Sequence, residues 1–423
     1  MSNLYGEILT PPLLRFDYSS IASQHANPRQ GLKIYGPYDQ NLLGKTNIRF
    51  AVIAAPGVQN PKDALVNGLC NGTGPFQGFK NLFRVPLLLQ KERVISIESE
   101  SEVRNAAQKI AKDGDVDLVF IITSSHREDL YRVGKLELLG NGIPSQFVEG
   151  EKLSDPNQAP WILENIALAS YSKIGGTPWV VASRSNKREL VIGVSRAQDK
   201  AKRYVVGFVT LFTQDGDFLI LHSIAPVLEW EQEKYVGGLS CLIVEAFEEY
   251  KRNQGDPEAI VFHFCKRPGR FREVEAAQQA LQKLKVSIPY ALLHLNNDAS
   301  YRLFDASHRT YVPQSGLKVN MSQHCALLLL DGRVNGERRR RGIPNVLEIS
   351  LDKRSTISVD EFPSLVRQIY DFARVNWRGF NAQAVPVTLN YSYLIARLIV
   401  ELGANNWSVI ISSGRLRDKA WFL

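Results

Sequence analysis

Three short strings decide how this chain is interpreted: YRVGK at residues 131–135, IPSQF at 143–147 and SKIGGTPW at 172–179. Tyr131 and Lys135 are four residues apart, so on a helix they share one face. Gln146 follows a Pro-Ser turn, and Lys173 ends a helical pattern just before a Gly-Gly stop. One phenol, one amide and two ammonium groups without a carboxylate suit a terminal phosphate, because lysines supply point charges while Tyr and Gln supply directional hydrogen bonds.

The order and spacing of these residues resemble the pocket in which the MID domain of Argonaute proteins anchors the 5′ phosphate of a guide strand. In that pocket a Tyr, a Lys four residues later, a Gln in a Pro-Ser-Gln-Phe-like turn and a Lys before Gly-Gly-x-Pro-Trp hold the phosphate. The resemblance implies a guide 5′-phosphate site made by Tyr131, Lys135, Gln146, Asn165 and Lys173. For any one of them an ordinary surface residue beside a turn is the simpler explanation, and it is the ordered set that favours the pocket.

The resemblance runs from the GPYD string at residues 36–39 to the WFL string at residues 421–423, and it is greatest to short prokaryotic Argonautes, which consist of MID and PIWI domains. In relatives with this ending, the α-carboxylate of the last residue enters the 5′-phosphate pocket through a divalent cation. The resemblance therefore implies Mg²⁺ in the pocket, held by Leu423 and by the side-chain carbonyl of Gln146. Phosphate, carboxylate and amide oxygens are hard ligands that Mg²⁺ accepts.

Composition narrows the class of protein without identifying its function. At 423 residues, with 44% hydrophobic and 22% charged residues, the chain is long enough for two or three domains of an ordinary soluble protein. It has no long apolar run that predicts a membrane span, and its first residues begin no signal peptide. Four scattered cysteines without a CxxC pair argue against a zinc site and disulfides and favour a cytoplasmic location. The net charge of +8 permits a polyanionic partner.

Strands and helices alternate between residues 47 and 180. Strands are expected at 47–55, 85–89, 117–123, 147–149 and 179–182, and helices at 61–70, 100–112, 131–139 and 161–173. The alternation predicts a doubly wound, mostly parallel, Rossmann-like α/β layer, which the resemblance identifies as a MID domain. Ligands of such sheets bind beyond the carboxyl ends of the strands, and we expect the pocket there. Residues 1–46 form a lead-in punctuated by Pro and Gly, which the resemblance places against the PIWI domain.

The pattern changes in residues 181–423. Three consecutive strands are expected at 189–195, 204–213 and 218–225, and a hairpin turn at residues 215–217 joins the last two. Further elements are expected at 237–252 (helix), 259–264 (strand), 273–285 (helix), 288–295, 301–304, 325–330 and 346–351 (strands), and 359–376 and 391–402 (helices). This is the order of an RNase H-like fold, as in PIWI. The predicted fold class is therefore α/β, with a Rossmann-like MID domain followed by an RNase H-like PIWI domain.

A nuclease of the RNase H-like kind needs carboxylates at particular strand ends, where they hold two metal ions. Members of the resembled family that cut have Asp where this chain has Gly193 and Cys265, and they have His or Asp near Ser392 or Tyr393. The chain is therefore expected not to be an enzyme, with any enzymatic activity in a partner subunit.

Two other groups of side chains resemble parts of a catalytic site. Asp215 and Asp217 supply carboxylates, but Asp-Gly between alternating strands is typical of a turn. His263 lies two residues from Cys265, but no second ligand pair accompanies them, so a core histidine and a core cysteine are expected instead of a metal site.

Two basic stretches are candidates for contact with a nucleic-acid backbone. Residues 337–342 read ERRRRG, a loop that either is simply solvated or follows phosphates through residues such as Arg339 and Arg340. Arg378, within NWRGF at residues 376–380, resembles an Argonaute residue near the guide backbone. An Arg at the C-terminal end of a helix is also favoured by the helix dipole alone.

Together these features predict a guide-binding protein that recognises complementary invading DNA without cutting it. The resemblance implies a short 5′-phosphorylated guide, expected to be RNA rather than DNA, and a single-stranded DNA target. It also implies a partner with a PAZ-like segment fused to a sirtuin-like or TIR NADase or to a nuclease, which target binding would activate against plasmids or phage. Two alternatives stay open: a stand-alone guided binding protein that acts as a homodimer, and a nuclease with a non-standard carboxylate set.

Overall fold

The computed structural model describes residues 5–40, 43–182, 187–202, 204–223, 227–266, 272–334, 342–403, 406–407, 410, 416 and 419–423. The chain forms two compact units, the first made of residues 1–13, 181–376 and 381–400, and the second of residues 14–180, 377–380 and 401–423. The expected lead-in of residues 1–46 is therefore divided. Most of it groups with residues 47–180, and two segments from the end of the chain, 377–380 and 401–423, join the same unit.

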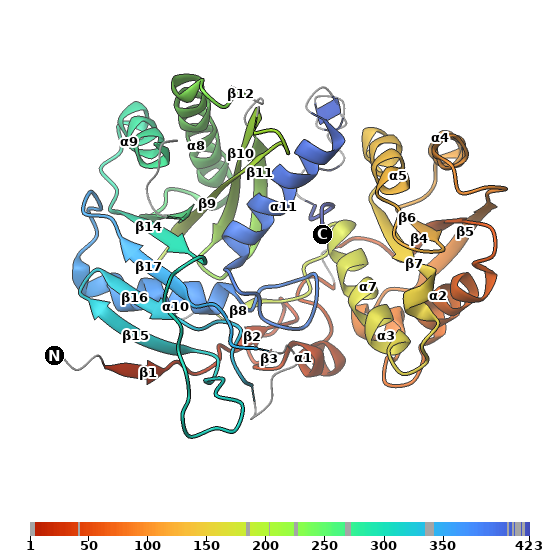
Figure 1. The fold of residues 1–423 in the computed structure, drawn as a ribbon, viewed down its shortest axis with the longest axis horizontal. Coiled ribbons are helices and arrows are strands. Elements are labelled where there is room, and N and C mark those ends of the chain that lie inside the picture. Colours follow the sequence, from red (N-terminus) through yellow and green to blue (C-terminus); the bar gives the residue numbers. More distant parts are fainter. Residues whose placement is uncertain are drawn as a thin grey trace. The chain divides into compact units, whose positions relative to one another are not determined.

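The first unit is built on a ten-stranded sheet with the order β1-β15-β16-β17-β14-β13-β9-β10-β11, in which β12 also pairs with β10 (Figure 1). Its strands are β1 (Gly6–Ile8), β9 (Glu189–Gln198), β10 (Tyr204–Thr213), β11 (Phe218–Ser223), β12 (Val227–Leu228), β13 (Ala259–Cys265), β14 (Tyr290–Asn296), β15 (Leu317–Ser322), β16 (Cys325–Leu328) and β17 (Leu347–Leu351). Strands β9, β10 and β11 form an antiparallel meander, and β13 and β14 run parallel to β9. This is the expected RNase H-like order.

Helices cover both faces of this sheet. On one face α8 (Gln232–Gln254) and α9 (Glu273–Leu284) pack on the sheet and bury a hydrophobic cluster. On the other face, the rings of Phe372 in α10 (Phe362–Phe372) and Tyr391 in α11 (Val387–Leu402) lie 6.1 and 6.2 Å from Phe212. A short 3₁₀ helix, η1 (Val359–Glu361), precedes α10. Because alternate residues of a strand point to opposite faces, alternate positions of β9, β10 and β13 face α11.

The structure tests the turn and the strands that were expected in this unit. The turn between β10 and β11 is confirmed, because Thr213 N–H donates to Asp217 O over 3.0 Å and Gly216 has a φ of +75°. The strand expected at residues 301–304 is wrong, since these residues form an irregular loop. Strands β1 and β15 were missed. β1 has three exposed residues and no alternation, whereas β15 does alternate apolar and polar residues and was overlooked.

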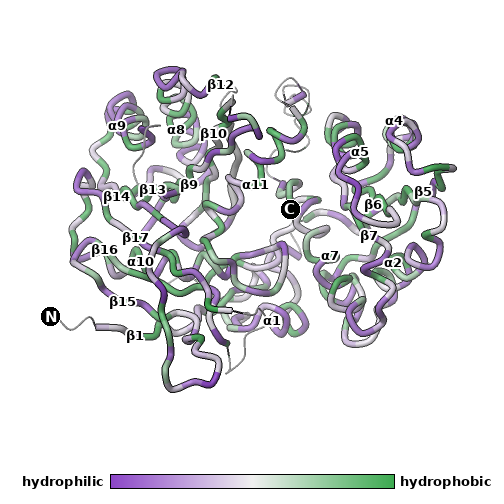
Figure 2. The backbone as a smooth tube through the Cα atoms, viewed as in Figure 1, coloured by the Kyte–Doolittle hydropathy of each residue, from purple (hydrophilic) through white to green (hydrophobic). Residues whose placement is uncertain are grey.

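The second unit contains a four-stranded parallel sheet with the order β5-β4-β6-β7. Its strands are β4 (Ile48–Ala54), β5 (Leu87–Val94), β6 (Leu118–Thr123) and β7 (Ser145–Glu149). Its helices are α1 (Pro28–Tyr35), α2 (Gln59–Asn71), α3 (Phe79–Phe83), α4 (Glu100–Asp113), α5 (Glu128–Gly140), α6 (Gly150–Leu153) and α7 (Ala159–Lys173). Figure 2 shows hydrophobic residues along β6, all of which are buried. The doubly wound α/β layer is confirmed.

The strand expected to close this sheet at residues 179–182 has a different partner. Strand β8 (Val180–Val181) belongs to a separate three-stranded sheet with β2 (Leu14–Arg15) and β3 (Gln24–His25). Two residues are too few to indicate a pairing partner from sequence. No helix in the described part of the chain is both long and apolar enough to cross a membrane.

Candidate phosphate-binding site

Two buried ammonium groups meet at one backbone oxygen in the second unit. Lys135, on α5, donates from Nζ to the carbonyl oxygen of Ser145 over 2.7 Å, and Lys173, the last residue of α7, donates to the same oxygen over 3.1 Å. The two residues are 2% and 1% exposed. Among the described residues, neither ammonium group has a carboxylate within ion-pair distance. The structure thus brings together two cations without an anion.

Gln146 and Tyr131 lie beside the two lysines. The Oε1 atom of Gln146 accepts a hydrogen bond from Lys173 Nζ over 2.5 Å, and its amide donates to Phe147 O over 2.9 Å. Lys135 Nζ lies 5.7 Å from the centre of the Tyr131 ring, as expected for residues one helical turn apart, and that ring packs on Phe147. The structure therefore groups four of the five predicted phosphate-binding residues.

Burial and nearby positive charges disfavour the charged form of both lysines. Burial, with a smaller effect from the nearby Arg378 charge, lowers the pKa of Lys135 to about 7. Burial, followed by the charges of Lys135 and Arg378, lowers the pKa of Lys173 well below its usual value. Arg378 was expected to contact nucleic-acid backbone; the structure places its charge close enough to act on both lysines. A group of buried cations of this kind is stabilised when an anion binds.

This cluster lies at the amino edge of the parallel sheet, whereas the site was expected beyond the carboxyl ends of the strands. Ser145, whose carbonyl accepts both lysines, is the first residue of β7. A cavity of about 250 Å³ opens at the same edge, where Asp117 precedes β6 and Pro144 precedes β7. The general rule for doubly wound sheets predicts a ligand site at the opposite edge, because the βα loops lie at the carboxyl ends of the strands.

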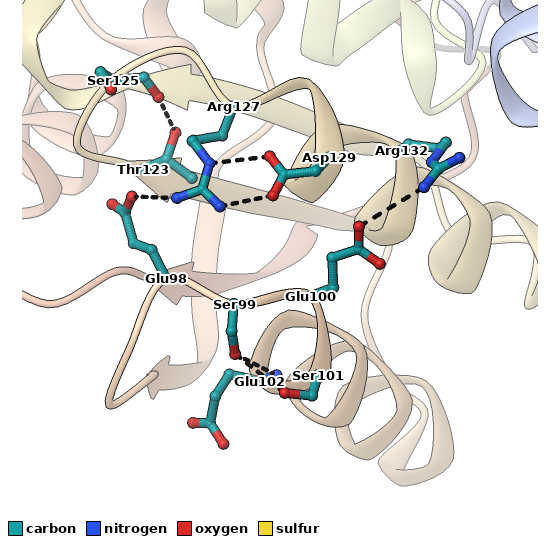
Figure 3. Close-up of polar contacts among 10 residues, drawn as sticks. All are labelled: Glu98, Ser99, Glu100, Ser101, Glu102, Thr123, Ser125, Arg127, Asp129 and Arg132. Carbon is teal, nitrogen blue, oxygen red and sulfur yellow. Dashed lines mark hydrogen bonds and ion pairs between the residues drawn. The ribbon is translucent and has the colours of Figure 1, made fainter.

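The carboxyl edge of the sheet is electrostatically balanced instead (Figure 3). Arg127, in the loop after β6, pairs with Asp129 over 2.6 Å and with Glu98 over 3.4 Å. Arg132, on the first half of α5, lies 3.7 Å from Glu100. Because carboxylates neutralise the arginines drawn there, that edge offers less to an anion than the lysine cluster does.

The end of α7 is fixed by a buried acid. Asp39 accepts hydrogen bonds from the Tyr171 hydroxyl over 2.6 Å and from the Thr177 N–H over 2.9 Å. Burial raises the pKa of Asp39 to about 6, and burial with the Asp39 charge raises the pKa of Tyr171. A Cβ at Gly176 would lie 2.4 Å from the Tyr171 ring, so no larger residue fits there. The GPYD and SKIGGTPW strings are therefore parts of one network that positions Lys173.

The remaining predicted residues differ in outcome. The Asn165 amide donates to Trp161 O, one helical turn back, and so lies outside the group that meets at Ser145. Leu423 is buried in the second unit, and its N–H donates to Ala420 O. Arg339 and Arg340 lie outside the described residues. The shared acceptor could not be predicted from the sequence, because any residue type can supply a backbone carbonyl.

In the first unit, the position expected for a nuclease carboxylate is filled by protein. A Cβ at Gly193 would lie 2.2 Å from the Thr388 carbonyl oxygen and 2.6 Å from Thr210 Oγ1. His263, opposite Gly193 in the parallel register, is fully buried and contacts Thr388 Oγ1 through Nδ1 over 2.8 Å. Burial lowers the pKa of His263 to about 3, so it is neutral near pH 7. Thr388 therefore occupies the space into which an aspartate at position 193 would extend.

Cys265 and Ser392 occupy the other expected carboxylate positions. Cys265 is half-buried at the end of β13, and burial raises the pKa of its thiol. The Ser392 hydroxyl is buried and donates to Thr388 O over 2.8 Å. Within the described residues, no three His, Cys, Asp or Glu side chains gather as a metal site.

The lysine pKa values predict how phosphate binding depends on pH. A phosphate bound here would raise the pKa of Lys135 above about 7, so the complex would hold more protons than the free protein above pH 7, and affinity would fall by roughly up to tenfold per pH unit. Below about pH 6 the phosphate loses its second charge, which also weakens binding. Titrating a 5′-phosphorylated strand from pH 5.5 to 9 should give maximal affinity near pH 6–7. A flat profile would contradict coupled lysine protonation.

The architecture and the site together define a class of protein with a MID-like α/β unit and an RNase H-like PIWI unit. The Piwi domain family matches residues 117–407, and the chain belongs to this family.

The chain is 27% identical to the Argonaute protein of Cereibacter sphaeroides, over 93% of this chain and 56% of that protein. It is 25% identical to the Piwi protein of Archaeoglobus fulgidus, over 93% of each. It thus spans about half the length of the first relative and nearly all of the second.

Solved structures share the fold. Drosophila Piwi superposes with a TM-score of 0.72 at 15% identity, over 99% of this chain and 56% of that one. Clostridium butyricum Argonaute, solved with a guide DNA and a 19-mer target DNA, superposes with a TM-score of 0.75 at 18% identity, over 95% of this chain and 53% of that one.

Proposed function

We propose that the chain anchors the 5′ phosphate of a short guide strand between Lys135 and Lys173, and that the guide then selects a complementary target strand. The observation that carries the proposal is the convergence of both buried ammonium groups on Ser145 O, with no carboxylate of the described residues paired to either. Removing charges from water without a counter-charge is costly, so a terminal phosphate is the group that would satisfy them. Sequence specificity would come from base pairing, as in other guided systems.

Binding of strands that differ only at the 5′ end tests this function. RNA and DNA of one sequence, each with a 5′-phosphate or a 5′-hydroxyl, are compared by fluorescence anisotropy. The phosphorylated strand should bind at least about tenfold more tightly, which corresponds to ~1.4 kcal/mol. The sugar that binds better identifies the guide, for which RNA is proposed. Equal affinity for the two ends would remove the basis of the proposal.

A divalent cation at the phosphate is part of the proposal. Gln146 Oε1 accepts one hydrogen bond and keeps a second lone pair, and with a Leu423 carboxylate it would form the hard oxygen set that Mg²⁺ prefers. Bound Mg²⁺ would neutralise phosphate charge. Repeating the end-group comparison with EDTA tests this, because the phosphate preference should shrink without Mg²⁺.

We propose further that the chain does not cut its target. The support is the space at Gly193, which Thr388 occupies, and the absence of carboxylate side chains at Gly193, Cys265 and Ser392. Incubation of a guide-loaded protein with labelled target and Mg²⁺ or Mn²⁺ should leave the target intact. Cleavage in this assay would favour a non-standard carboxylate set.

Response to invading DNA would then need a second protein. A PAZ-like effector with sirtuin-like or TIR NADase, or nuclease, activity is proposed as the partner, with defence against plasmids or phage as the outcome. Co-expression with the product of an adjacent gene, followed by purification on one tag, tests the association; recovery of this chain alone would count against it.

A further inference from the structure

The segment that carries Arg378 is held at both ends within the second unit, by a hydrogen bond at Trp377 and by ring contacts at Phe380. The Trp377 indole N–H donates to Trp179 O over 3.1 Å, and the Phe380 ring stacks on Trp179 with centroids 5.9 Å apart. Trp179 is fully buried, so it is a fixed support. Arg378 lies between these two anchored residues, and the direction in which it leaves the backbone is set by them.

Arg29 also packs on Phe380. Its guanidinium lies 4.7 Å from the Phe380 ring centre and 5.0 Å from the Trp161 ring centre. Its Nε donates over 2.7 Å to Glu164, whose side chain is only 2% exposed. A planar guanidinium can stack on rings while it pairs with a carboxylate, and a lysine ammonium cannot do both in the same way.

The position of Arg29 is itself fixed locally. It is the second residue of α1, and Asn27, the N-cap, accepts hydrogen bonds from the N–H groups of Arg29 and Gln30. The capped start of α1 therefore places the Arg29 guanidinium in a fixed position against the buried Glu164 and Phe380. The ordinary alternative is that this contact only stabilises the unit.

We propose that Arg29 is a positioning residue for guide binding: by clamping Phe380 against Trp179, it holds Arg378 where that residue contacts the 5′-terminal phosphate region of the guide. The inference rests on the proposed phosphate site. Its consequence is that the lead-in helix, which supplies no group to the pocket itself, controls the affinity for the phosphorylated end.

A double-mutant cycle between Arg29→Lys and Arg378→Ala tests the proposal. Arg29→Lys keeps a charge opposite Glu164, so it avoids leaving a buried carboxylate unpaired. The quantity measured is the ratio of affinities for 5′-phosphate and 5′-hydroxyl strands. Arg29→Lys should lower this ratio about threefold to tenfold in the wild-type background and should have no further effect when Arg378 is already Ala. Phe380→Leu should reproduce the loss.

Controls separate this inference from the function on which it rests. Arg104→Lys changes an exposed Arg–Glu pair of similar geometry, 3.1 Å from Glu137, and should leave the ratio unchanged. If Lys173→Met abolishes the preference but Arg29→Lys does not, or if the loss persists in the Arg378→Ala background, the positioning role is wrong while the phosphate site stands. If wild type itself shows no preference, the proposed function fails first.

Discussion

Lys173→Met is expected to make the ligand-free protein more stable while abolishing its preference for a 5′-phosphorylated strand. Lys173 is fully buried beside a second ammonium group, and its pKa is lowered by burial and by the charges of Lys135 and Arg378. Methionine fills a similar volume without a charge. Replacing buried ionic groups by apolar ones stabilises by about 1–4 kcal/mol in favourable cases. Ser145 O still accepts from Lys135, so no new orphan acceptor is created there.

The lowered pKa of Lys173 also predicts how the free energy of unfolding changes with pH. Between the lowered pKa in the folded state and the ordinary value near 10.5 in the unfolded chain, the unfolded chain binds more protons, so wild-type stability rises with pH in that window. Lys173→Met should flatten that rise. Urea unfolding at pH 7 and pH 9 measures it.

The matched control removes an exposed lysine from the same unit. Lys152 is 57% exposed and pairs with Glu149, so Lys152→Met should leave both stability and phosphate preference nearly unchanged. A strong loss of stability in Lys173→Met, absent from the control, would mean that the ammonium group supports the fold and is not held there for an anion.

The parts of the fold that sequence predicted are those with local causes. The apolar run of β6 and the Asp-Gly turn at Gly216 are encoded in consecutive residues, and both were found. The grouping of Tyr131, Lys135, Gln146 and Lys173 was predictable because helical spacing and two turns bring them together. By contrast, the edge of the sheet at which they meet depends on how α5 and α7 pack, which no single string encodes.

Long-range contacts account for what the sequence left open. Arg29 and Glu164 are 135 residues apart, and neither has a pattern that identifies its partner. Arg378 lies near the lysines because its neighbours Trp377 and Phe380 are anchored to Trp179. In the sequence, most of the PIWI unit separates Trp179 from these residues. Likewise, the missing carboxylate at Gly193 was visible in the sequence, but the Thr388 carbonyl that fills its space was not.

Gly193→Asp is expected to destabilise the first unit severely without creating a nuclease. Even a Cβ at this position would lie 2.2 Å from the Thr388 carbonyl oxygen, and this nearest atom belongs to the backbone, which cannot rotate aside. Overpacking of a well-filled core costs about 1–3 kcal/mol. An aspartate adds a buried carboxylate beside a carbonyl oxygen and a neutral histidine, so desolvation increases the cost.

Comparison with two alanine variants isolates the cause. Gly193→Ala should lower the free energy of unfolding, whereas Gly237→Ala, in helix α8 with nothing within 4 Å of the new Cβ, should be neutral or stabilising by up to ~1 kcal/mol. Thermal and urea unfolding measure the difference.

The second experiment tests cleavage. Target cleavage with Mn²⁺ is assayed on the folded fraction of Gly193→Asp and of the double variant that also carries Cys265→Asp. Because α11 would have to withdraw Thr388 before a metal could bind beside residue 193, restoring carboxylates alone should not restore cutting. A stable Gly193→Asp protein that cuts would show that Thr388 yields readily and that a carboxylate at position 193 is enough for cutting.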